Sequence, residues 1–324
     1  MKKLMISICI VAIGGLLSAC GSSNSSEDSS NFPENQIEVV VPFAAGGASD
    51  LVSRTIATEM ENELDVPVVV SNKTGGSGTT GMLATKDAKP DGYTIGYVPV
   101  ELAMVQELGL AEIAPNDYQA IGQLMTIPAA ITVSADAPYD TIEEFISYAE
   151  ENPGEVKVGN SGTGSIWHIA AAAFAQELDL ELEYIPYDGA APAVTALMGG
   201  HVDAVSVSPS EVVAGLDSED LKVLAVMSEE RDANVPDVPT LQELGYDINL
   251  SGWGGFVAPT DTPDEVMETL QSAFKIAAES EAFTNLLEER GMNPNYKDGA
   301  EFQQFAQDQY EYFSELIPSI DLSN

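Results

Sequence analysis

Cysteine, histidine and basic residues are scarce in this sequence of 324 residues. It contains two cysteines, Cys9 and Cys20, and two histidines. A disulfide framework, a cysteine-based zinc site and a cysteine nucleophile therefore have almost no residues to draw on. Lys and Arg number 12 against 52 Asp and Glu, for a formal net charge of −40. This charge argues against nucleic-acid binding and against docking on anionic lipid, because both depend on basic side chains.

The rest of the composition is that of a folded, soluble protein. Hydrophobic residues make up 44% of the chain and charged residues 20%, which provides a core and argues against wholesale disorder. The length predicts about two domains. Two interpretations of the acidic excess stay open: adaptation to a saline medium, where salt screens the repulsion between acidic groups, or an ordinary acidic surface.

The N-terminal segment predicts export. Residues 1–19 have the layout of a secretory signal peptide, in which a basic start precedes an apolar run, 4–17, that is short for a transmembrane span. Leu17-Ser18-Ala19-Cys20 resembles a bacterial lipobox, in which Cys20 is lipidated and becomes the mature N-terminus. An ordinary signal peptide with small residues near its cleavage site is the alternative. The small polar residues that follow predict a flexible tether over 20–32, so we expect a lipid-anchored, extracytoplasmic protein.

The body of the chain alternates strand-like and helix-like segments. The predicted strands are 37–43, 66–71, 93–98, 156–158, 182–185, 202–207 and 221–226, and the predicted helices are 49–63, 82–87, 141–150, 166–178 and 192–198. This alternation predicts an α/β fold with parallel sheets and right-handed crossovers. Three final helices, 263–280, 281–290 and 300–316, follow one another without a strand, so the chain is expected to return to a domain already built.

Three glycine- and hydroxyl-rich loops follow predicted strands, at 42–50, 74–81 and 160–165. Loops at the carboxyl ends of strands are where open α/β sheets bind ligands. Each of these loops offers backbone N–H groups and hydroxyls at the start of a helix, which can hold an anion without a cation. Tight turns that need glycine are the alternative for each loop, but three such loops favour an anion site.

An ordered series of motifs resembles the substrate-binding proteins of the tripartite tricarboxylate transporters, also called the Bug family. The resemblance covers about residues 36–317, and single motifs in it are weak whereas the series is strong. The motifs are Val40 to Asp50 with Arg54, Asn72 to Gly75, Ala88 to Thr94, Ser161 to His168, Pro186 to Ala193, Gly199 to Asp203, Val238 to Thr240 and Trp253 to Phe256.

The resemblance implies a periplasmic-binding-protein-like α/β fold, with two lobes of mostly parallel sheets flanked by helices. The first lobe would combine 33–132 with 253–324, and the second would be 133–252. Such proteins bind small carboxylates (di- or tricarboxylates or acidic amino acids), largely through backbone N–H groups, and deliver them to a membrane transporter. Carried over to this chain, the ligand-binding residues would be Phe43, Ala44, Gly46, Gly47 and Ser49 facing Ser161, Thr163 and Ser165, with Gly78, Thr79 and Thr80 in the same site and His168 as a further candidate.

The chain departs from the family pattern at three places. Lys73-Thr74 stands where Arg-Pro is usual, Thr79 where Asn is usual, and Asp188 where a basic residue is common. These departures leave the distal end of the ligand open. We expect a monomer without cofactor or metal, whose partners are the ligand and either the integral-membrane transporter subunits or, as the alternative, a membrane sensor kinase.

Two enzymatic interpretations fit the residues less well. Gly76 to Gly81 matches the dinucleotide-binding pattern G-x-G-x-x-G, with Glu101 twenty residues further on, but an exported protein meets no dinucleotide pool. An exported serine hydrolase would use Ser161 or Ser165 with His168 or His201, although the G-x-S-x-G pattern is incomplete because Thr163 stands where glycine is required.

Four further residues are expected to have structural roles. Arg54 should pair with Asp50, four residues before it on one helix. Trp253 should pack near the hinge between the lobes, and Asp203 should support the chain locally.

Overall fold

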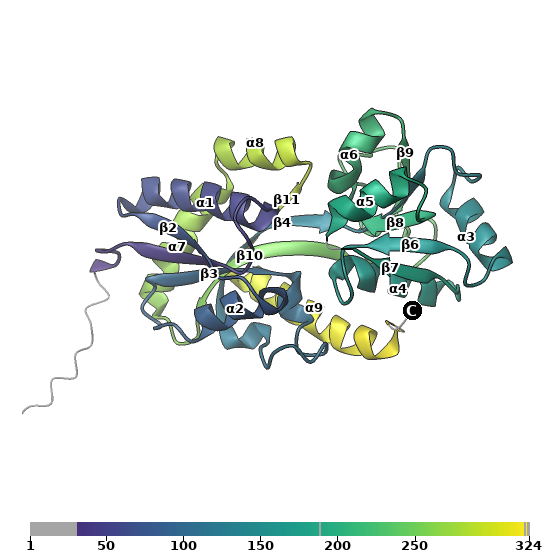
Figure 1. Cartoon of the computed structure of the whole chain (residues 1–324). Helices are drawn as coiled ribbons and strands as arrows, with labels where there is room; N and C mark the ends of the chain where they lie inside the picture. Colours follow the sequence, from purple (N-terminus) through teal and green to yellow (C-terminus); the bar gives the residue numbers. More distant parts are fainter. Residues whose placement is uncertain (1–30, 188, 321, 323–324) are drawn as a thin grey trace, which may run out of the picture.

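The structure is a computed structural model that describes residues 31–187, 189–320 and 322. Two lobes lie side by side, each built around one β-sheet, and extended strands join them (Figure 1). The predicted signal peptide, Cys20 and most of the predicted tether lie outside the described residues, as does Asp188. The tether was expected to reach residue 32, but the ring of Phe32 packs edge-on against Tyr93 of the first lobe, with ring centroids 5.1 Å apart.

The first lobe contains a six-stranded sheet in the order β11-β4-β10-β3-β1-β2. Its strands are β1 (Ile37–Val41), β2 (Val68–Asn72), β3 (Thr94–Pro99), β4 (Tyr118–Pro128), β10 (Ser251–Pro259) and β11 (Asn293–Asp298). Its helices are α1 (Ala48–Leu64), α2 (Thr79–Lys86), α7 (Asp264–Ala278) and α8 (Glu281–Arg290). Helix α1 buries Val52, Ile56 and Met60, whose spacing of four residues puts them on one face toward the apolar strands.

The second lobe contains a five-stranded sheet in the order β7-β6-β8-β5-β9. Its strands are β5 (Ala130–Ser134), β6 (Lys157–Asn160), β7 (Glu183–Pro186), β8 (Ala204–Val207) and β9 (Leu221–Val226). Its helices are α3 (Ile142–Glu151), α4 (Ile166–Glu177), α5 (Ala190–Met198) and α6 (Pro209–Asp217). Every residue of α4 from Ile166 to Ala175 is buried, which explains why this helix is apolar all round.

The chain passes between the lobes at three places. The first is Ala129, the single residue between β4 and β5. The second is the segment that returns from β9 to β10, and its backbone bonds to the first: Ala129 N–H donates to Leu250 O at 2.9 Å, and Met227 N–H donates to Ala129 O at 2.7 Å. The third is α9 (Gly299–Ser319), which starts in the first lobe and ends where Ser319 hydrogen-bonds Gln176 of α4.

The strands at the crossover correct the expected topology. The nine strand pairs of the described residues comprise four parallel pairs, among β1, β2, β3 and among β6, β7, β8, and five antiparallel pairs that involve β4, β5, β10, β11 or β9. The expectation of mostly parallel sheets therefore holds only for the strands away from the crossover. Strand β11 also interrupts the C-terminal segment that was expected to be purely helical, because it adds an edge strand to β4.

The chain passes from one sheet to the other at residues slightly different from the predicted lobe boundaries. Strand β5, which starts at Ala130, belongs to the second sheet, and β10, which starts at Ser251, belongs to the first. The boundaries placed after residues 132 and 252 fall inside these two strands. A chain that crosses between sheets in extended conformation gives no turn signal at the crossing, so the sequence pattern shows no break there.

Candidate functional site

The loops at the carboxyl ends of the parallel strands lie at the crossover in both lobes. In the first lobe, Pro99 at the end of β3 pairs with Gly254, near the start of β10, and β1 runs parallel to β3. In the second lobe, Val207 at the end of β8 pairs with Ala130, the first residue of β5, and β6 runs parallel to β8. Since β5 and β10 both begin at the crossover, the strand-end loops of each lobe face the other lobe.

Asp50 shapes the loop after β1. Its side chain is 2% exposed, and its carboxylate accepts hydrogen bonds from Gly46 N–H at 2.8 Å, Arg54 Nε at 2.9 Å and Asn72 Nδ2 at 2.8 Å. Asn72 Nδ2 also donates to Phe43 O at 2.9 Å. The expected Asp50–Arg54 ion pair is therefore confirmed, and it is part of a network that fixes the loop to the end of β2.

The electrostatics of this network keep Asp50 ionised. Burial opposes ionisation, but the hydrogen bonds from Arg54, Gly46 and Asn72 outweigh it and hold the pKa of Asp50 below its usual value of 3.8. Lys73, the next basic residue in these loops, pairs with Glu38 at 3.3 Å. Both basic side chains near the loop are thus occupied by acidic partners.

The loop after β2 packs directly on the loop after β1. A Cβ on Gly78 would lie 3.4 Å from the Phe43 ring, and a Cβ on Gly81 would lie 2.7 Å from Pro42 Cα. Glycine at position 81 is therefore what lets α2 approach the end of β1. The structure therefore brings the predicted residues Gly78 and Phe43 together. Of the two predicted threonines at the start of α2, Thr79 is buried and Thr80 is exposed.

His168 shapes the loop after β6 in the second lobe. Gly164 N–H donates to His168 Nδ1 at 3.0 Å, and the Ser165 hydroxyl accepts from His168 N–H at 3.2 Å as the cap of α4. Asn160 Oδ1, at the end of β6, accepts from Gly162 N–H at 2.9 Å. The imidazole is 2% exposed and lies edge-on to Tyr184, with ring centroids 5.2 Å apart.

Two buried donors in this loop lack partners. Burial lowers the pKa of His168, so the imidazole is neutral at pH 7, and because Nδ1 accepts a hydrogen bond the proton is on Nε2. Among the described residues, neither His168 Nε2 nor Asn160 Nδ2 has a hydrogen-bond partner. Unsatisfied buried polar atoms cost free energy and are expected at functional sites.

Contacts across the crossover bring the second-lobe loop and the start of α4 against the first lobe. A Cβ on Gly164 would lie 3.7 Å from Leu108 Cδ2, in the connection after β3. Trp167, in the first turn of α4, approaches Gly252 of β10 and hydrogen-bonds Glu211 at the start of α6. The second-lobe loop and α4 thus contact the first lobe at two places, the connection after β3 and strand β10.

Some of the predicted ligand residues already form hydrogen bonds within the protein, and others do not. Gly46 N–H is taken by Asp50, the Ser49 hydroxyl bonds Tyr97, and Ser165 caps α4. Among the described residues, the hydroxyls of Ser161 and Thr163 have no hydrogen-bond partner. The engaged residues therefore shape the loops, and the free hydroxyls and first-turn N–H groups of α1 and α4 are what remains for a ligand.

The sequence analysis gave no supporting role to the residues that hold these loops in place. Asn72, Tyr97 and Asn160 lie at or near the ends of strands β2, β3 and β6. A polar residue at the carboxyl end of an apolar strand is the one signal that could have pointed to them. Trp253 packs as expected: it is 2% exposed, with its ring edge-on to Phe302 and Phe305 of α9.

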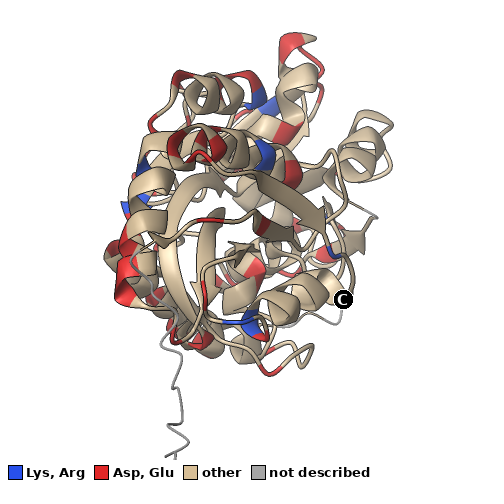
Figure 2. Ribbon diagram, turned by 90° about the vertical axis from the view of Figure 1, so that its left-hand side faces the viewer, with Lys and Arg blue, Asp and Glu red and all other residues tan. Residues whose placement is uncertain are grey.

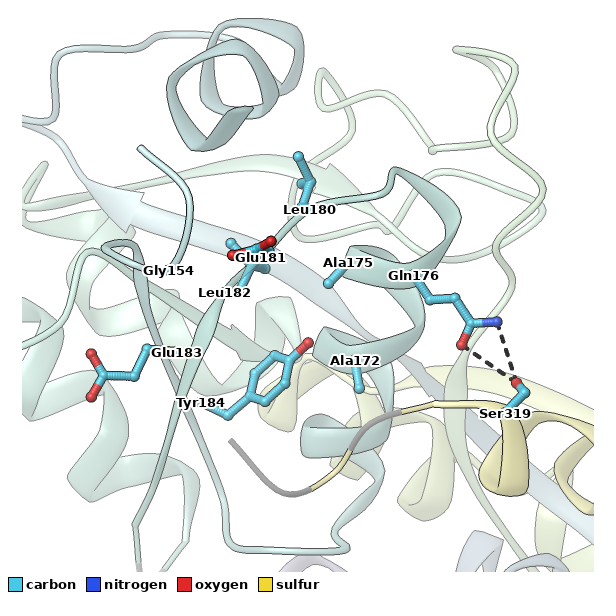
Figure 3. A pocket seen from close by; sticks show the side chains of 10 residues that line it. All are labelled: Gly154, Ala172, Ala175, Gln176, Leu180, Glu181, Leu182, Glu183, Tyr184 and Ser319. Atoms are coloured by element: carbon cyan, nitrogen blue, oxygen red, sulfur yellow. Dashed lines mark hydrogen bonds between the residues drawn. The ribbon is translucent and has the colours of Figure 1, made fainter. Parts of the chain in front are cut away.

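Two large cavities of the described structure lie away from the strand-end loops. One of about 760 Å³ lies between α4, β7 and the end of α9, where Gln176 and Ser319 bond each other (Figure 3). The other, of about 710 Å³, lies beside the crossover and is lined by segments of both lobes, among them Thr126, Asn249 and Lys297. Neither is lined by a predicted ligand residue.

Charge and chemistry limit what the site can do. Acidic residues are spread over the outer end of the first lobe, with few basic ones among them (Figure 2). In the part of the chain that the structure describes, no group of three or more His, Cys, Asp and Glu side chains could hold a metal, and no serine hydroxyl bonds an imidazole nitrogen. None of the described helices is both long and apolar enough to cross a membrane.

These features define a two-lobed α/β solute-binding protein of the periplasmic-binding-protein class. The model of the tripartite tricarboxylate transporter family receptor matches residues 52–322. The chain belongs to this family of extracytoplasmic solute-binding receptors, which confirms the resemblance and the fold predicted from the motifs. The matched range begins after the loop between β1 and α1.

Relatives of known sequence or structure match along most of the chain. The UPF0065 protein in the gbd 5′ region of Cupriavidus necator is 30% identical over 293 residues, which cover 90% of this chain and 89% of the relative. A TctC solute-binding protein from Polaromonas, crystallised without ligand, is 36% identical with a TM-score of 0.82 and covers 89% of this chain and 100% of its own. MatC from Rhodopseudomonas palustris, solved with bound malate, is 27% identical with a TM-score of 0.73 and covers 88% and 100%.

Proposed function

We propose that this protein captures a small carboxylate between its two lobes and delivers it to the membrane subunits of a tripartite transporter. The observation that carries the proposal is the pair of strand-end loop groups that face each other at the crossover, each ending in a helix N-terminus. Free first-turn N–H groups at a helix N-terminus favour an anion. The malate bound to MatC supports a carboxylate as the ligand class.

The donors on the two loops are sufficient for micromolar affinity. A hydrogen bond to a charged group contributes about 1.5–3 kcal/mol. Four such bonds contribute about 6–12 kcal/mol before the costs of binding, and a micromolar complex needs about 8 kcal/mol. The predicted residues best placed to contribute these hydrogen bonds are Phe43, Ala44, Gly47, Ser161 and Thr163. Because such bonds suffice for micromolar affinity, the site needs no arginine. Arg54 and Lys73 are in any case paired with acids.

The proposal also includes a lipid anchor at the N-terminus and a tripartite transporter as the partner. The lipobox-like Leu17-Ser18-Ala19-Cys20 supports a lipid anchor on Cys20, which would hold the receptor at the outer face of the membrane. The family description supports a tripartite transporter as the partner. The acidic surface is a proposed adaptation to salt, since screening at high ionic strength reduces the repulsion that an approaching anion meets.

A thermal-shift screen tests the ligand class. The full chain, purified in mild detergent, is heated with malate, succinate, citrate and aspartate, and with the matching amides, at low and high salt. A ligand at 100 times its dissociation constant adds about 2.7 kcal/mol to the free energy of unfolding. We expect at least one carboxylate, but not its amide, to raise the melting temperature. No shift with any carboxylate in a folded sample would contradict the proposal.

A further inference from the structure

Asp232 is a buried acid in the segment that returns from the second lobe to the first. It follows β9 in the chain and is 1% exposed. Its Oδ1 accepts hydrogen bonds from the Asn234 backbone N–H and from Asn234 Nδ2, both at 2.8 Å. Its Oδ2 accepts from Asn293 Nδ2 at 2.8 Å, and Asn293 is the first residue of β11 in the first lobe. Both oxygens of this buried side chain are therefore used, one of them by the other lobe.

A second hydrogen bond joins the same segment to the first lobe. Asn234 Nδ2 also donates to the backbone oxygen of Gly291 at 2.8 Å. Gly291 ends α8, and β11 begins two residues later. We call Asp232, Asn234, Gly291 and Asn293 the rear tie. It holds the return segment to the corner between α8 and β11 by two bonds.

The return segment is attached to the second lobe as well. Arg231 Nε donates to both carboxylate oxygens of Glu243, at 3.0 Å and 2.9 Å. Glu243 in turn accepts from the Thr240 backbone N–H at 3.1 Å, and Thr240 forms a parallel bridge with Val226 at the end of β9. Hydrogen bonds therefore connect the edge of one sheet to the edge of the other through this segment.

The rear tie lies on the side of the crossover opposite the predicted ligand loops. In the first sheet, β4 and β11 lie on one side of β10, and β3, β1 and β2 lie on the other. In the second sheet, β9 lies on one side of β5, and β8, β6 and β7 lie on the other. The predicted loops follow β1, β2 and β6. The cavity of about 710 Å³ is lined both by the segment after β9 and by β11, so these two edges face the same side, which we call the rear side.

The two lobes are thus in contact on both sides of the crossover. On the side of the predicted loops, a Cβ on Gly164 would lie 3.7 Å from Leu108 Cδ2, and on the rear side the tie supplies hydrogen bonds. Domains rotate about a few residues at the ends of elements, and the crossing segments are of this kind. The rear tie restricts such a rotation, because the lobes cannot separate there without breaking its bonds.

We propose that Asp232 is a positioning residue for ligand capture: the rear tie holds the two lobes at the spacing in which the strand-end loops face one ligand. The inference rests on the proposed function, because it needs a ligand between those loops. Apparent affinity falls in proportion to the fraction of the protein that has the binding arrangement. Asp232 therefore raises affinity from the rear side, through the spacing of the lobes and without touching the ligand.

Two variants loosen the tie and leave Asp232 in place. Asn234→Ala removes the side-chain bonds to Asp232 and Gly291, and Asn293→Ala removes the bond to the second oxygen. Asn152→Ala is the matched control: Asn152 is also half-buried and its Nδ2 also donates to a backbone oxygen at 2.8 Å, that of Tyr148, but both residues belong to the second lobe.

Two measurements on the full chain in mild detergent test the proposal. Calorimetric titration with malate, succinate and citrate gives Kd, and small-angle neutron scattering with contrast-matched detergent gives the radius of gyration. We expect each tie variant to raise Kd about threefold to tenfold, which corresponds to the loss of about one hydrogen bond. The ligand-free tie variants should have a larger radius of gyration than the wild-type chain, and saturating ligand should restore it. The control should match the wild-type chain in both quantities.

The outcomes separate this inference from the proposed function. Unchanged Kd and radius of gyration in folded tie variants overturn the positioning role and leave the receptor function standing. A raised Kd without a larger ligand-free radius of gyration also overturns it, since the loss would not come from the spacing of the lobes. Equal weakening by Asn152→Ala does the same. No binding of any of the three acids to folded wild-type chain removes the proposed function together with the inference.

Discussion

In the first lobe a carboxylate closes the loop after β1, and in the second lobe an imidazole closes the loop after β6. Gly46 N–H donates to Asp50 and Gly164 N–H donates to His168, in both cases to the side chain four residues further on. An asparagine at the end of a strand, Asn72 or Asn160, completes each loop. The shared geometry shows that the fold needs an acceptor at this place in the helix, while the residue type is free to differ.

The two loops differ in how they avoid a net charge. Asp50 is ionised and its charge is balanced by Arg54, whereas burial lowers the pKa of His168 and keeps it neutral. Neither loop therefore repels an anion, and neither attracts one through a free cation. We infer from this comparison that a ligand at the two loops is recognised by oriented N–H groups and hydroxyls, and we expect the two lobes to respond differently to mutation and to pH.

The largest expected effect follows from removing the carboxylate of the first lobe. Asp50→Ala leaves Gly46 N–H, Arg54 and Asn72 without their acceptor, so the free energy of unfolding should fall by about 2–4 kcal/mol and carboxylate binding should be lost. Urea denaturation followed by circular dichroism measures the first quantity. Asp87→Ala, at an exposed position after α2, is the control. Unchanged stability of Asp50→Ala would show that the network does not hold the loop.

A smaller loss is expected from the corresponding change in the second lobe. His168→Leu keeps the volume beside Tyr184 but leaves the Gly164 N–H without an acceptor, which should cost about 1–3 kcal/mol. His168→Gln, which retains an acceptor, should lose less. Equal losses for the two variants, measured by urea denaturation, would mean that the packing of His168 and not its hydrogen bond sets its contribution to stability.

Acid should loosen the second-lobe loop before the first. The folded state lowers the pKa of His168 below its ordinary 6.5, so the stability it contributes is complete above that pH and declines as pH falls below it. The pKa of Asp50 lies below 3.8, so its contribution declines only below that value. Hydrogen exchange between pH 7 and pH 4 should show Ser161 to Trp167 losing protection first. Loss at Gly46 to Leu51 first would contradict the assignment.

The smallest expected effects concern the free hydroxyls. Ser161→Ala and Thr163→Val should each weaken carboxylate binding about tenfold, because one hydrogen bond to a charged group is lost, and should leave stability unchanged. Thr269→Val, on the outer helix α7, is the matched control. Calorimetric titration of each variant gives the comparison, and unaltered affinity in both loop variants would place the ligand elsewhere.

The sequence allowed strands β1, β2, β3, β6, β7, β8 and β9 and the helices other than α6 to be predicted, because they follow simple periodicities. Strands β4, β5, β10 and β11 were not predicted, and for the last two the reason is visible in the structure. In β10, Gly254 and Gly255 stand where Tyr97 and Phe302 occupy the space of a side chain, so the strand lacks the apolar alternation that marks one. Strand β11 is half-buried and polar, since it covers an edge of the sheet.

The sequence indicated where the candidate site lies, but it did not distinguish residues that hold the loops in shape from residues that remain for a ligand. Three glycine-rich loops at strand ends indicated where a ligand would bind, and the structure gathers these loops at the crossover. The sequence could not tell that Gly46 and Ser165 serve the loops themselves, because those bonds depend on the turn geometry.

Hydrogen exchange of the full chain, with and without the carboxylate that gives the largest thermal shift, tests the central claim most directly. If the two loop groups close on one ligand, Phe43 to Ser49 and Ser161 to Trp167 should gain protection together, at the same ligand concentration. Protection confined to one of the two loops, or found only at a distant surface such as the cavity beside Gln176, would contradict the account.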